Sequence, residues 1–315
     1  MYTIGIDLGG TNIAVGLVSE NKIIKKATTP TLAKREPEEI VKDMAKLCHQ
    51  VIEEASLKVS DIAFCGISTP GIANNDAGRV EYANNLPFSF FPIAEILKKY
   101  IPFEKVYIAN DANAAAKGEA ECGAAAGSRC SVMITLGTGV GGGIIIDKKV
   151  YAGFNNAGGE LGHIVIVQGG RQCTCGRRGC WETYSSATGL ILTTKEKMLE
   201  TKDTIMWDMC EGSIDKISGK TAFKAARAGD KAGKEVVDDY VKMLGCGLTN
   251  IVNIFQPEIL SIGGGVCNEG DYLLDPVKEI VYREQYSAEN VPDTKIVIAQ
   301  LGNDAGIIGA AMLGI

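Results

Sequence analysis

One histidine and three cysteines stand close together near the middle of the chain, and all four side chains are potential metal ligands. They are His163, Cys173, Cys175 and Cys180. One imidazole and three thiolates form a donor set that Zn²⁺ accepts as a closed tetrahedral site, with no position left open for water or substrate. We therefore expect a structural zinc rather than a catalytic one. Its role would be to shape the loop that carries Glu160, His163 and Glu182.

The other seven cysteines are spread through apolar or helical stretches, where a free cysteine behaves as a small buried hydrophobic residue. They are Cys48, Cys65, Cys122, Cys130, Cys210, Cys246 and Cys267. We expect no disulfide framework among them. A bond between Cys173 and Cys175 is disfavoured by ring strain and by a reducing compartment. His49, the second histidine, falls in a predicted amphipathic helix and is expected to be an ordinary helix residue.

Three glycine-rich turns follow predicted strands, and glycine there lets backbone N–H groups approach phosphate oxygens closely. The residues of the three turns are Gly9, Gly10 and Thr11; Gly137, Thr138 and Gly139; and Gly263, Gly264 and Gly265. The first turn follows Asp7, whose carboxylate can orient Mg²⁺ through water beside the phosphates. The third turn has no hydroxyl or charged side chain, so it fits the flat adenosine better than a phosphate. Together the turns predict a site for ATP with Mg²⁺.

Two common nucleotide-binding patterns are missing from the sequence. No G-x-x-x-x-G-K-[ST] motif occurs, which disfavours a P-loop enzyme, and no turn reads as G-x-G-x-x-G before a helix. The second turn leads into a strand instead. A nicotinamide-dependent enzyme is therefore disfavoured.

Strands and helices alternate along the chain in a pattern typical of an α/β fold. Strands are expected at residues 2–6, 13–18, 62–67, 106–109, 132–136, 143–146, 259–262 and 295–301, and helices at 38–56, 93–100, 112–120 and 304–313. The stretch 216–255 is expected to be mostly helical. The unit of strand, glycine turn and strand occurs twice. We infer two halves of similar topology.

The composition is that of an ordinary globular protein of two domains. The chain has 315 residues, 46% of them hydrophobic, and a net charge of −6. That charge argues against a general nucleic-acid binder, because such proteins carry a basic excess that neutralises phosphates. No apolar run reaches membrane-spanning length and no signal peptide is recognised, so we expect no membrane partner and a cytoplasmic location.

The order of the three glycine turns resembles the phosphate-1, phosphate-2 and adenosine segments of the superfamily of actin, heat-shock chaperones and hexokinase. The resemblance implies two ribonuclease-H-like domains with an active-site cleft between them. We expect a small N-terminal α/β domain at residues 1–113, completed by the C-terminal helix at 302–315. A large α/β domain with the zinc loop is expected at 114–301.

Within that superfamily the stretch with the three cysteines resembles the motif of one family. Residues 173–182 read C-T-C-G-R-R-G-C-W-E, which resembles the C-x-C-G-x-x-G-C-x-E motif of the ROK family of repressors, uncharacterised reading frames and sugar kinases. Residues 160–163, E-L-G-H, resemble its E-x-G-H sugar-binding motif, and residues 136–144 resemble part of its signature. D-L-G-G-T at 7–11 and N-D-A-N at 110–113 also stand where the family has them.

Asp111 follows a predicted strand and begins a predicted helix, where a carboxylate could receive the proton of an attacking hydroxyl. The same position would suit a helix N-cap. The resemblance implies the role of general base for Asp111 in an ATP-dependent sugar kinase. It also implies a set of sugar contacts: Gly71, Asn85, Asn110, Asp111, Glu160, His163 and Glu182. His163 would then hold zinc with one ring nitrogen and a sugar hydroxyl with the other.

The details of the pattern resemble the ROK glucokinases most, which implies phosphorylation of glucose to glucose 6-phosphate. Kinases of N-acetylmannosamine, fructose and allose share much of the pattern and stay open as alternatives, as does a sugar-sensing protein without catalysis. A repressor of this family would carry a helix-turn-helix segment ahead of the strand that starts at Tyr2, so we do not expect that role. Family members are often dimers or tetramers, and we expect a homo-oligomer.

Overall fold

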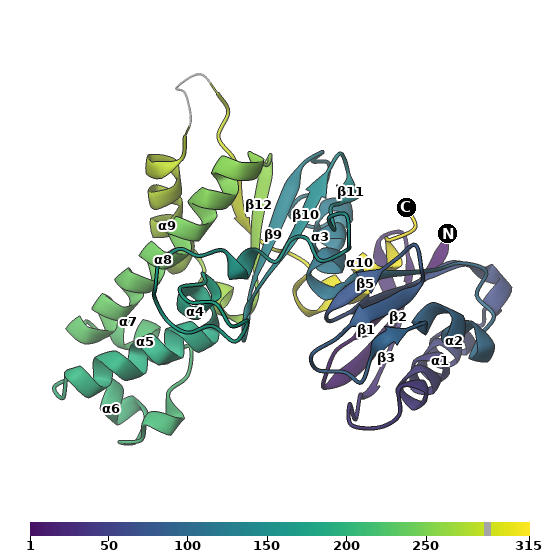
Figure 1. Cartoon of the computed structure of the whole chain (residues 1–315), viewed down its shortest axis with the longest axis horizontal. Helices are drawn as coiled ribbons and strands as arrows, with labels where there is room; N and C mark the ends of the chain where they lie inside the picture. The colour runs from purple at the N-terminus through teal and green to yellow at the C-terminus, as the bar shows by residue number, and fades with distance from the viewer. Residues whose placement is uncertain (287–290) are drawn as a thin grey trace. The chain divides into compact units, whose positions relative to one another are not determined.

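The computed structural model describes residues 1–286 and 291–315, which form two compact units (Figure 1). Unit 1 comprises residues 1–133, 143–159 and 299–315, so it holds both ends of the chain. Unit 2 comprises residues 134–142 and 160–298. The α/β fold class predicted from the sequence is confirmed.

The sheet of unit 1 has the strand order β3-β2-β1-β4-β8. Its strands are β1 (Tyr2–Leu8), β2 (Asn12–Ser19), β3 (Lys22–Pro30), β4 (Ile62–Thr69) and β8 (Val106–Asn110). The first three strands form an antiparallel meander, whereas β4 and β8 join it in parallel. The first glycine turn is the tip of the β1–β2 hairpin, and both Asp7 and Asn110 lie at carboxyl ends of strands. In open α/β sheets, ligands bind at the carboxyl ends of the parallel strands.

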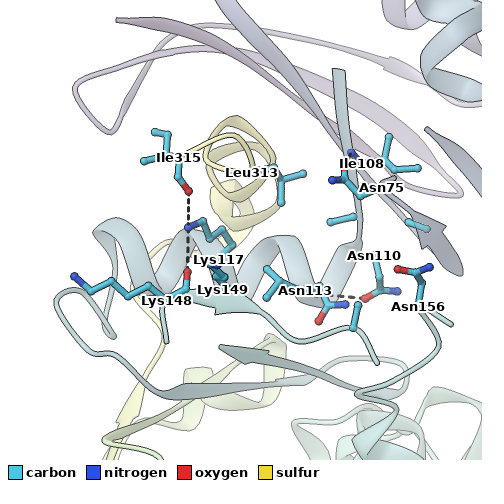
Figure 2. A pocket seen from close by; sticks show the side chains of 14 residues that line it. Asn75, Ile108, Asn110, Asn113, Lys117, Lys148, Lys149, Asn156, Leu313 and Ile315 are labelled. Carbon is cyan, nitrogen blue, oxygen red and sulfur yellow. Dashed lines mark hydrogen bonds between the residues drawn. The ribbon is translucent and has the colours of Figure 1, made fainter. Parts of the chain in front are cut away.

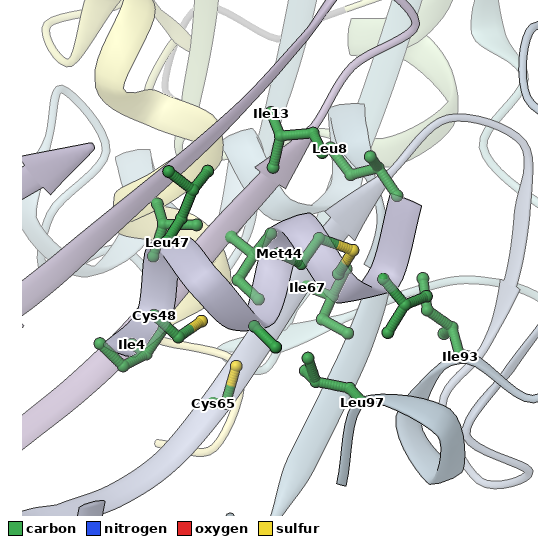
Figure 3. Packing of buried hydrophobic residues seen from close by; sticks show 14 of the residues in the cluster. Ile4, Leu8, Ile13, Met44, Leu47, Cys48, Cys65, Ile67, Ile93 and Leu97 are labelled. Carbon is green, nitrogen blue, oxygen red and sulfur yellow. The ribbon is translucent and has the colours of Figure 1, made fainter. Parts of the chain in front are cut away.

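Helices α1 (Pro37–Glu53) and α2 (Ile93–Tyr100) cover one face of this sheet with a core of aliphatic side chains. Figure 3 shows Met44 of α1 packing beside Ile67 of β4. In the same core the fully buried thiols of Cys48 and Cys65 face each other, and burial together with Cys48 raises the pKa of Cys65.

Helices α3 (Asp111–Cys122) and α10 (Ala305–Ala311) belong to unit 1 as well, and α10 packs on β1 and β4. Two glycines allow this close approach. A Cβ atom at Gly5 would stand 1.9 Å from Ile307 O, and one at Gly66 would stand 1.8 Å from Ala310 O. Unit 1 also holds a small antiparallel sheet of β5 (Ile72–Asn74), β6 (Arg79–Tyr82) and β7 (Ser89–Phe91), and the short 3₁₀ helices η1 (Val59–Asp61) and η5 (Gly302–Asp304).

The second large sheet has the order β11-β10-β9-β12-β13. Its strands are β9 (Ser131–Leu136), β10 (Val140–Ile146), β11 (Lys149–Val150), β12 (Ile259–Gly263) and β13 (Lys295–Ile298). The first, second and third strands in sequence lie on one side of the sheet and the fourth and fifth on the other, as in unit 1. Two halves of similar topology were predicted from the repeated glycine turns, and the sheets confirm them.

Strands β12 and β13, residues 134–136 of β9 and residues 140–142 of β10 belong to unit 2, whereas β11 and the remaining residues of β9 and β10 belong to unit 1. Unit 2 is otherwise mostly helical. It contains α4 (Glu182–Ser185), α5 (Ala187–Glu200), α6 (Met206–Met209), α7 (Thr221–Arg227), α8 (Lys231–Phe255) and α9 (Asp271–Glu284), with the 3₁₀ helices η2 (Leu161–His163), η3 (Ile214–Lys216) and η4 (Gly265–Glu269). The long helix α8 carries an apolar face into the unit and ends at Gln256, which adopts a left-handed conformation before Pro257.

The bounds of the compact units differ from the predicted domains. Helix α3 packs against α10 and β11, so unit 1 extends beyond the predicted boundary at 113. The last strand also differs: it ends at Ile298, not 301, because Glu119 of α3 binds the backbone N–H groups of Gln300 and Leu301.

Among the described residues, no helix has both the length and the apolar composition needed to cross a membrane.

Candidate active site

The four predicted metal ligands come together in unit 2, with their ligand atoms all within 4.8 Å of one another. His163 closes the short helix η2, and the cysteines follow on a loop held by the isolated bridges Val165 to Cys180 and Gln172 to Arg178. Cys173 and Cys180 are buried, whereas Cys175 is exposed. Burial and the neighbouring thiols raise the pKa of Cys180 to about 12, so without a cation its thiol stays protonated near neutral pH.

Two of the spacings among these atoms match those of zinc ligands. Zn–S bonds of about 2.3 Å and Zn–N bonds of about 2.0 Å at a tetrahedral angle place two sulfurs about 3.8 Å apart, and a sulfur and nitrogen about 3.5 Å apart. The distance from Cys173 Sγ to His163 Nδ1 is 3.6 Å, and Cys175 Sγ to Cys180 Sγ is also 3.6 Å. Because Nδ1 faces the cluster, Nε2 of His163 remains for another partner.

Arg171 supports the loop that carries the three cysteines, and the sequence motifs did not indicate this role. Its guanidinium donates to Thr183 O at 3.1 Å and to Thr193 Oγ1 at 3.0 Å, pairs with Glu196, and lies over the ring of Tyr184. These contacts join the loop to α4 and α5. An arginine inside a loop gives no sequence signal for such contacts, because its partners lie outside the motif.

Glu182 follows the last cysteine of the loop and connects it to the second glycine turn. Its Oε2 accepts a hydrogen bond from Val140 N at 2.9 Å. A Cβ atom at Gly139 would stand 2.3 Å from the same oxygen, so a larger residue there would displace the Glu182 carboxylate. Glu160, in contrast, is exposed, and its carboxylate has no hydrogen-bond or ion-pair partner within the part of the chain that the structure describes.

The third glycine turn joins β12 to η4 in unit 2. Gly264 has a φ of 96° and packs on β9, where a Cβ atom would stand 2.4 Å from Leu136 O. At Gly265 an added Cβ would meet nothing within 4 Å. Packing against β9 therefore requires glycine at position 264, whereas the space beside Gly265 is open.

The first glycine turn and Asp7 lie in unit 1. Asp7 accepts a hydrogen bond from Ser68 Oγ at 3.1 Å. Burial raises the pKa of the Asp7 carboxyl, and the charge of Asp111 raises it further, whereas Ser68 lowers it. Asp7 and Asp111 are thus close enough to influence each other. Thr31 Oγ1 donates to Gly9 O at 2.6 Å and holds the turn from outside.

Asn110, rather than Asp111, is the N-cap of α3. Asn110 Oδ1 accepts from Ala112 N at 2.9 Å and from Asn113 N at 3.3 Å, and its Nδ2 donates to Gly71 O at 3.0 Å. Asp111 is the first residue of the helix, and its Oδ1 accepts from Ala112 N at 2.8 Å. The Asp111 side chain reaches solvent, but protein atoms surround much of its carboxyl group. This partial burial raises the pKa of the carboxyl above the usual 3.8.

Two more predicted sugar contacts lie near these residues in unit 1. Gly71 has a φ of 88°, and a Cβ atom there would stand 2.0 Å from Tyr82 O, so the backbone of β6 already requires glycine. Asn85 is exposed beside the first glycine turn, with its Cβ 3.4 Å from a Cβ built on Gly10. The predicted site residues therefore form two groups, one on each unit.

Unit 1 also holds a cavity of about 270 Å³ beside α3, which the motifs did not predict (Figure 2). Asn110, Asn113 and Lys117 line one side of it, and Leu313 and Ile315 lie on another. Lys117 Nζ is already bound to Glu121, Lys148 O and Ile315 O. Asp111 does not line this cavity.

The whole chain matches known proteins. A sequence model described as the ROK family matches residues 3–315. The chain is 36% identical to a glucokinase of Streptomyces coelicolor over 99% of its own length and 96% of that protein. It is also 36% identical to a glucokinase of Thermotoga maritima, over 98% of this chain and 96% of that one.

A solved structure is similar over the same span. It is a ROK family glucokinase from Streptomyces griseus in complex with glucose and AMPPNP, with 34% identity, a TM-score of 0.81 and 99% of each chain covered. The similarity thus includes both units.

Proposed function

The chain belongs to the ROK family, and on that premise we propose that it is an ATP-dependent hexokinase that phosphorylates glucose to glucose 6-phosphate. Its full-length similarity to two glucokinases supports the choice of a sugar acceptor. The two glycine turns at the tips of hairpins, one in each sheet, support a nucleotide as the second substrate.

The placement of Asp111 carries this proposal. Its carboxylate stands at the carboxyl end of β8 and at the first residue of α3, with a neighbouring carboxylate at Asp7. Asp111 would accept the proton of the sugar hydroxyl as that oxygen attacks the γ-phosphate of ATP. Its raised pKa favours this role, because a base works best when its pKa approaches the working pH.

Asp7 is assigned to Mg²⁺. Two neighbouring carboxylates attract a divalent cation, and Ser68 fixes the orientation of Asp7 by donating to Oδ1. Mg²⁺ bound through water would neutralise the charge on the phosphates. Gly9, Gly10, Thr11, Gly137, Thr138 and Gly139 would hold the phosphates through backbone N–H and hydroxyl groups, and Gly263, Gly264 and Gly265 the adenosine.

The sugar would be bound through hydrogen bonds to its ring of hydroxyls. We assign this role to Gly71, Asn85, Asn110, Asp111, Glu160, His163 and Glu182. Asn110 keeps one N–H of Nδ2 for a hydroxyl, since the structure uses the other for Gly71 O. His163 keeps Nε2, because Nδ1 faces the cysteines. A zinc ion in that cluster would supply structural rigidity, with no part in the transfer itself.

Kinases of N-acetylmannosamine, fructose or allose remain the alternative within the same chemistry. A sugar-sensing protein without catalysis is the alternative outside it, and the presence of Asp111 and both phosphate turns argues against that one. We also propose that the protein forms a homodimer or homotetramer, which light scattering would measure.

A panel of sugars tests the proposal. ADP release is measured with glucose, mannose, fructose, allose and N-acetylmannosamine at saturating Mg-ATP, together with calorimetric sugar binding. We expect the highest kcat/KM for glucose. A higher value for another sugar would replace glucose by that sugar, and sugar binding without any ADP release would overturn the kinase proposal in favour of a sensor.

A further inference from the structure

The second glycine turn has little intrinsic order. It comprises residues 137–139 and runs into Val140 at the start of β10, and two of its three residues are glycine, which has the widest backbone freedom. One internal hydrogen bond joins Gly137 N to Gly139 O at 3.0 Å. Any further order must come from neighbouring elements.

That order comes from residues 181–188, a segment that we name the strut. Ala187 N donates to Gly137 O at 2.8 Å. Thr188 Oγ1 donates to Thr138 O at 2.7 Å. Both bonds are short and engage carbonyl groups, so the strut fixes the direction in which this backbone points.

The third contact between strut and turn is the bond from Val140 N to Glu182 Oε2. It takes the amide at the start of β10. The remaining amides of the turn, Thr138 N and Gly139 N, have no hydrogen-bond partner within residues 1–286 and 291–315. A turn whose carbonyls face the protein and whose amides stay free is arranged to bind an anion.

The strut itself is anchored in helix α8. Trp181 is fully buried, its Nε1 donates to Met243 O at 3.0 Å, and its indole lies where a Cβ atom of Gly247 would be, 2.0 Å from the ring. Tyr240 OH donates to Ser185 O at 2.7 Å. These contacts hold the strut from the side of α8.

We propose that the strut positions the second glycine turn for ATP, with Glu182, Ala187 and Thr188 as positioning residues for the nucleotide phosphates. The proposal rests on the proposed function, because it takes residues 137–139 as a phosphate-binding turn. Glu182 then has a second role beside its assigned sugar contact: it links the sugar side and the nucleotide side of unit 2.

Thr188 gives the cleanest test, since its side chain is exposed and is not assigned to either substrate. In Thr188→Val the hydroxyl is lost with little change of shape, so the Thr138 carbonyl is released. We expect the Kd for the non-hydrolysable analogue AMPPNP and the KM for ATP to rise about two- to five-fold, the effect of one hydrogen bond. The KM for glucose should stay unchanged.

Two further variants make this result specific. Thr188→Ser restores the hydroxyl and should restore the AMPPNP affinity. Thr201→Val, at the other end of α5, changes the same residue type without touching the turn and should leave the affinity unchanged. Circular dichroism melting of all three confirms that each variant is folded.

The outcomes separate this inference from the proposed function. A wild-type protein that binds no AMPPNP would overturn the proposed function itself. A wild-type protein that binds AMPPNP, with a Thr188→Val variant of equal affinity, would overturn only the strut. A parallel loss of glucose and AMPPNP affinity in Thr188→Val would also overturn it, since that result indicates general loosening of unit 2.

Discussion

Gly306 faces Asp7 so closely that a Cβ atom on this glycine would stand 2.6 Å from the carboxyl carbon of Asp7. The contact joins α10 to the end of β1, two elements at opposite ends of the chain. The Asp7 carboxylate also accepts the hydrogen bond from Ser68 Oγ.

Gly306→Ala is therefore expected to displace the Asp7 carboxylate while α10 stays folded, because alanine favours a helix. If Asp7 orients Mg²⁺, the Mg²⁺ concentration that gives half-maximal activity should rise several-fold. A Mg²⁺ titration of ADP release measures it. Gly219→Ala is the matched control, since an added Cβ there meets only Ala187 Cβ, at 4.0 Å. An unchanged Mg²⁺ requirement in Gly306→Ala would argue against the assignment of Asp7.

Asp111→Asn should lower kcat about 10²- to 10⁴-fold, the usual contribution of a general base. Sugar binding, measured by calorimetry, should persist, because asparagine keeps a hydrogen-bonding side chain. Partial burial raises the pKa of Asp111, so its charge at pH 7 disfavours the folded state. The variant should thus melt no lower than the wild type. Asp76→Asn, an exposed site in unit 1, is the control, and normal turnover in Asp111→Asn would remove Asp111 as the base.

The pH profile should show an acid limb set by two carboxyls. Burial raises the pKa of both Asp7 and Asp111 above 3.8. Each must be ionised to act, so kcat/KM should fall as the pH drops, starting at a higher pH than an ordinary aspartate would give. Because two groups are involved, the limb should be steeper than one proton. A limb centred at 3.8 with a slope of one would contradict this.

Cys175→Ser should remove the metal and weaken sugar binding. The cluster then loses one of its four donors, and elemental analysis should fall from one zinc per chain toward none. Sugar affinity should decrease because His163 is no longer held on the cluster side. Cys246→Ser, which changes a cysteine of α8 outside the cluster, should keep its zinc. Full zinc content in Cys175→Ser would contradict the assignment of Cys175 as a metal ligand. Zinc loss with unchanged sugar affinity would contradict the link between the metal and the sugar site.

Glu119→Gln tests a buried carboxylate of α3 that binds the backbone of the segment before α10. Glu119 is 0% exposed and accepts hydrogen bonds from Ala124 N, Gln300 N and Leu301 N. Glutamine would direct an NH₂ group at these donors, so unfolding free energy should fall by about 2 kcal/mol. Urea denaturation measures the loss, with Glu279→Gln on the exposed face of α9 as the control. Equal midpoints for the two variants would show that the carboxylate is dispensable.

The sequence predicted the elements that have strong periodicity. The helix at 93–100 and the strand at 62–67 lie where the structure has α2 and β4, because apolar spacing and flanking turns are local signals. Strand β3 and helices α5 and α9 were missed. The exposed face of β3 carries lysine and threonine, so it lacks the continuous apolar run of a buried strand.

The candidate site was predictable where it consists of a motif within one stretch. The cluster of His163 with three cysteines needed only composition and spacing, and the structure brings all four together. The contacts of Glu182 with Val140 and of Arg171 with Thr193 join distant parts of the chain, so spacing alone could not reveal them. The role of Asn110 as cap, in place of Asp111, depended on backbone angles that two adjacent polar residues leave open.

The discontinuous composition of unit 1 has a consequence for synthesis on the ribosome. Residues 160–298 of unit 2 are complete before the segment 299–315 is made, and that segment contributes α10. Until then, Gly5 of β1 and Gly66 of β4 lack the helix that covers them. The nascent unit 1 therefore keeps one face of its sheet uncovered until residues 299–315 have been made.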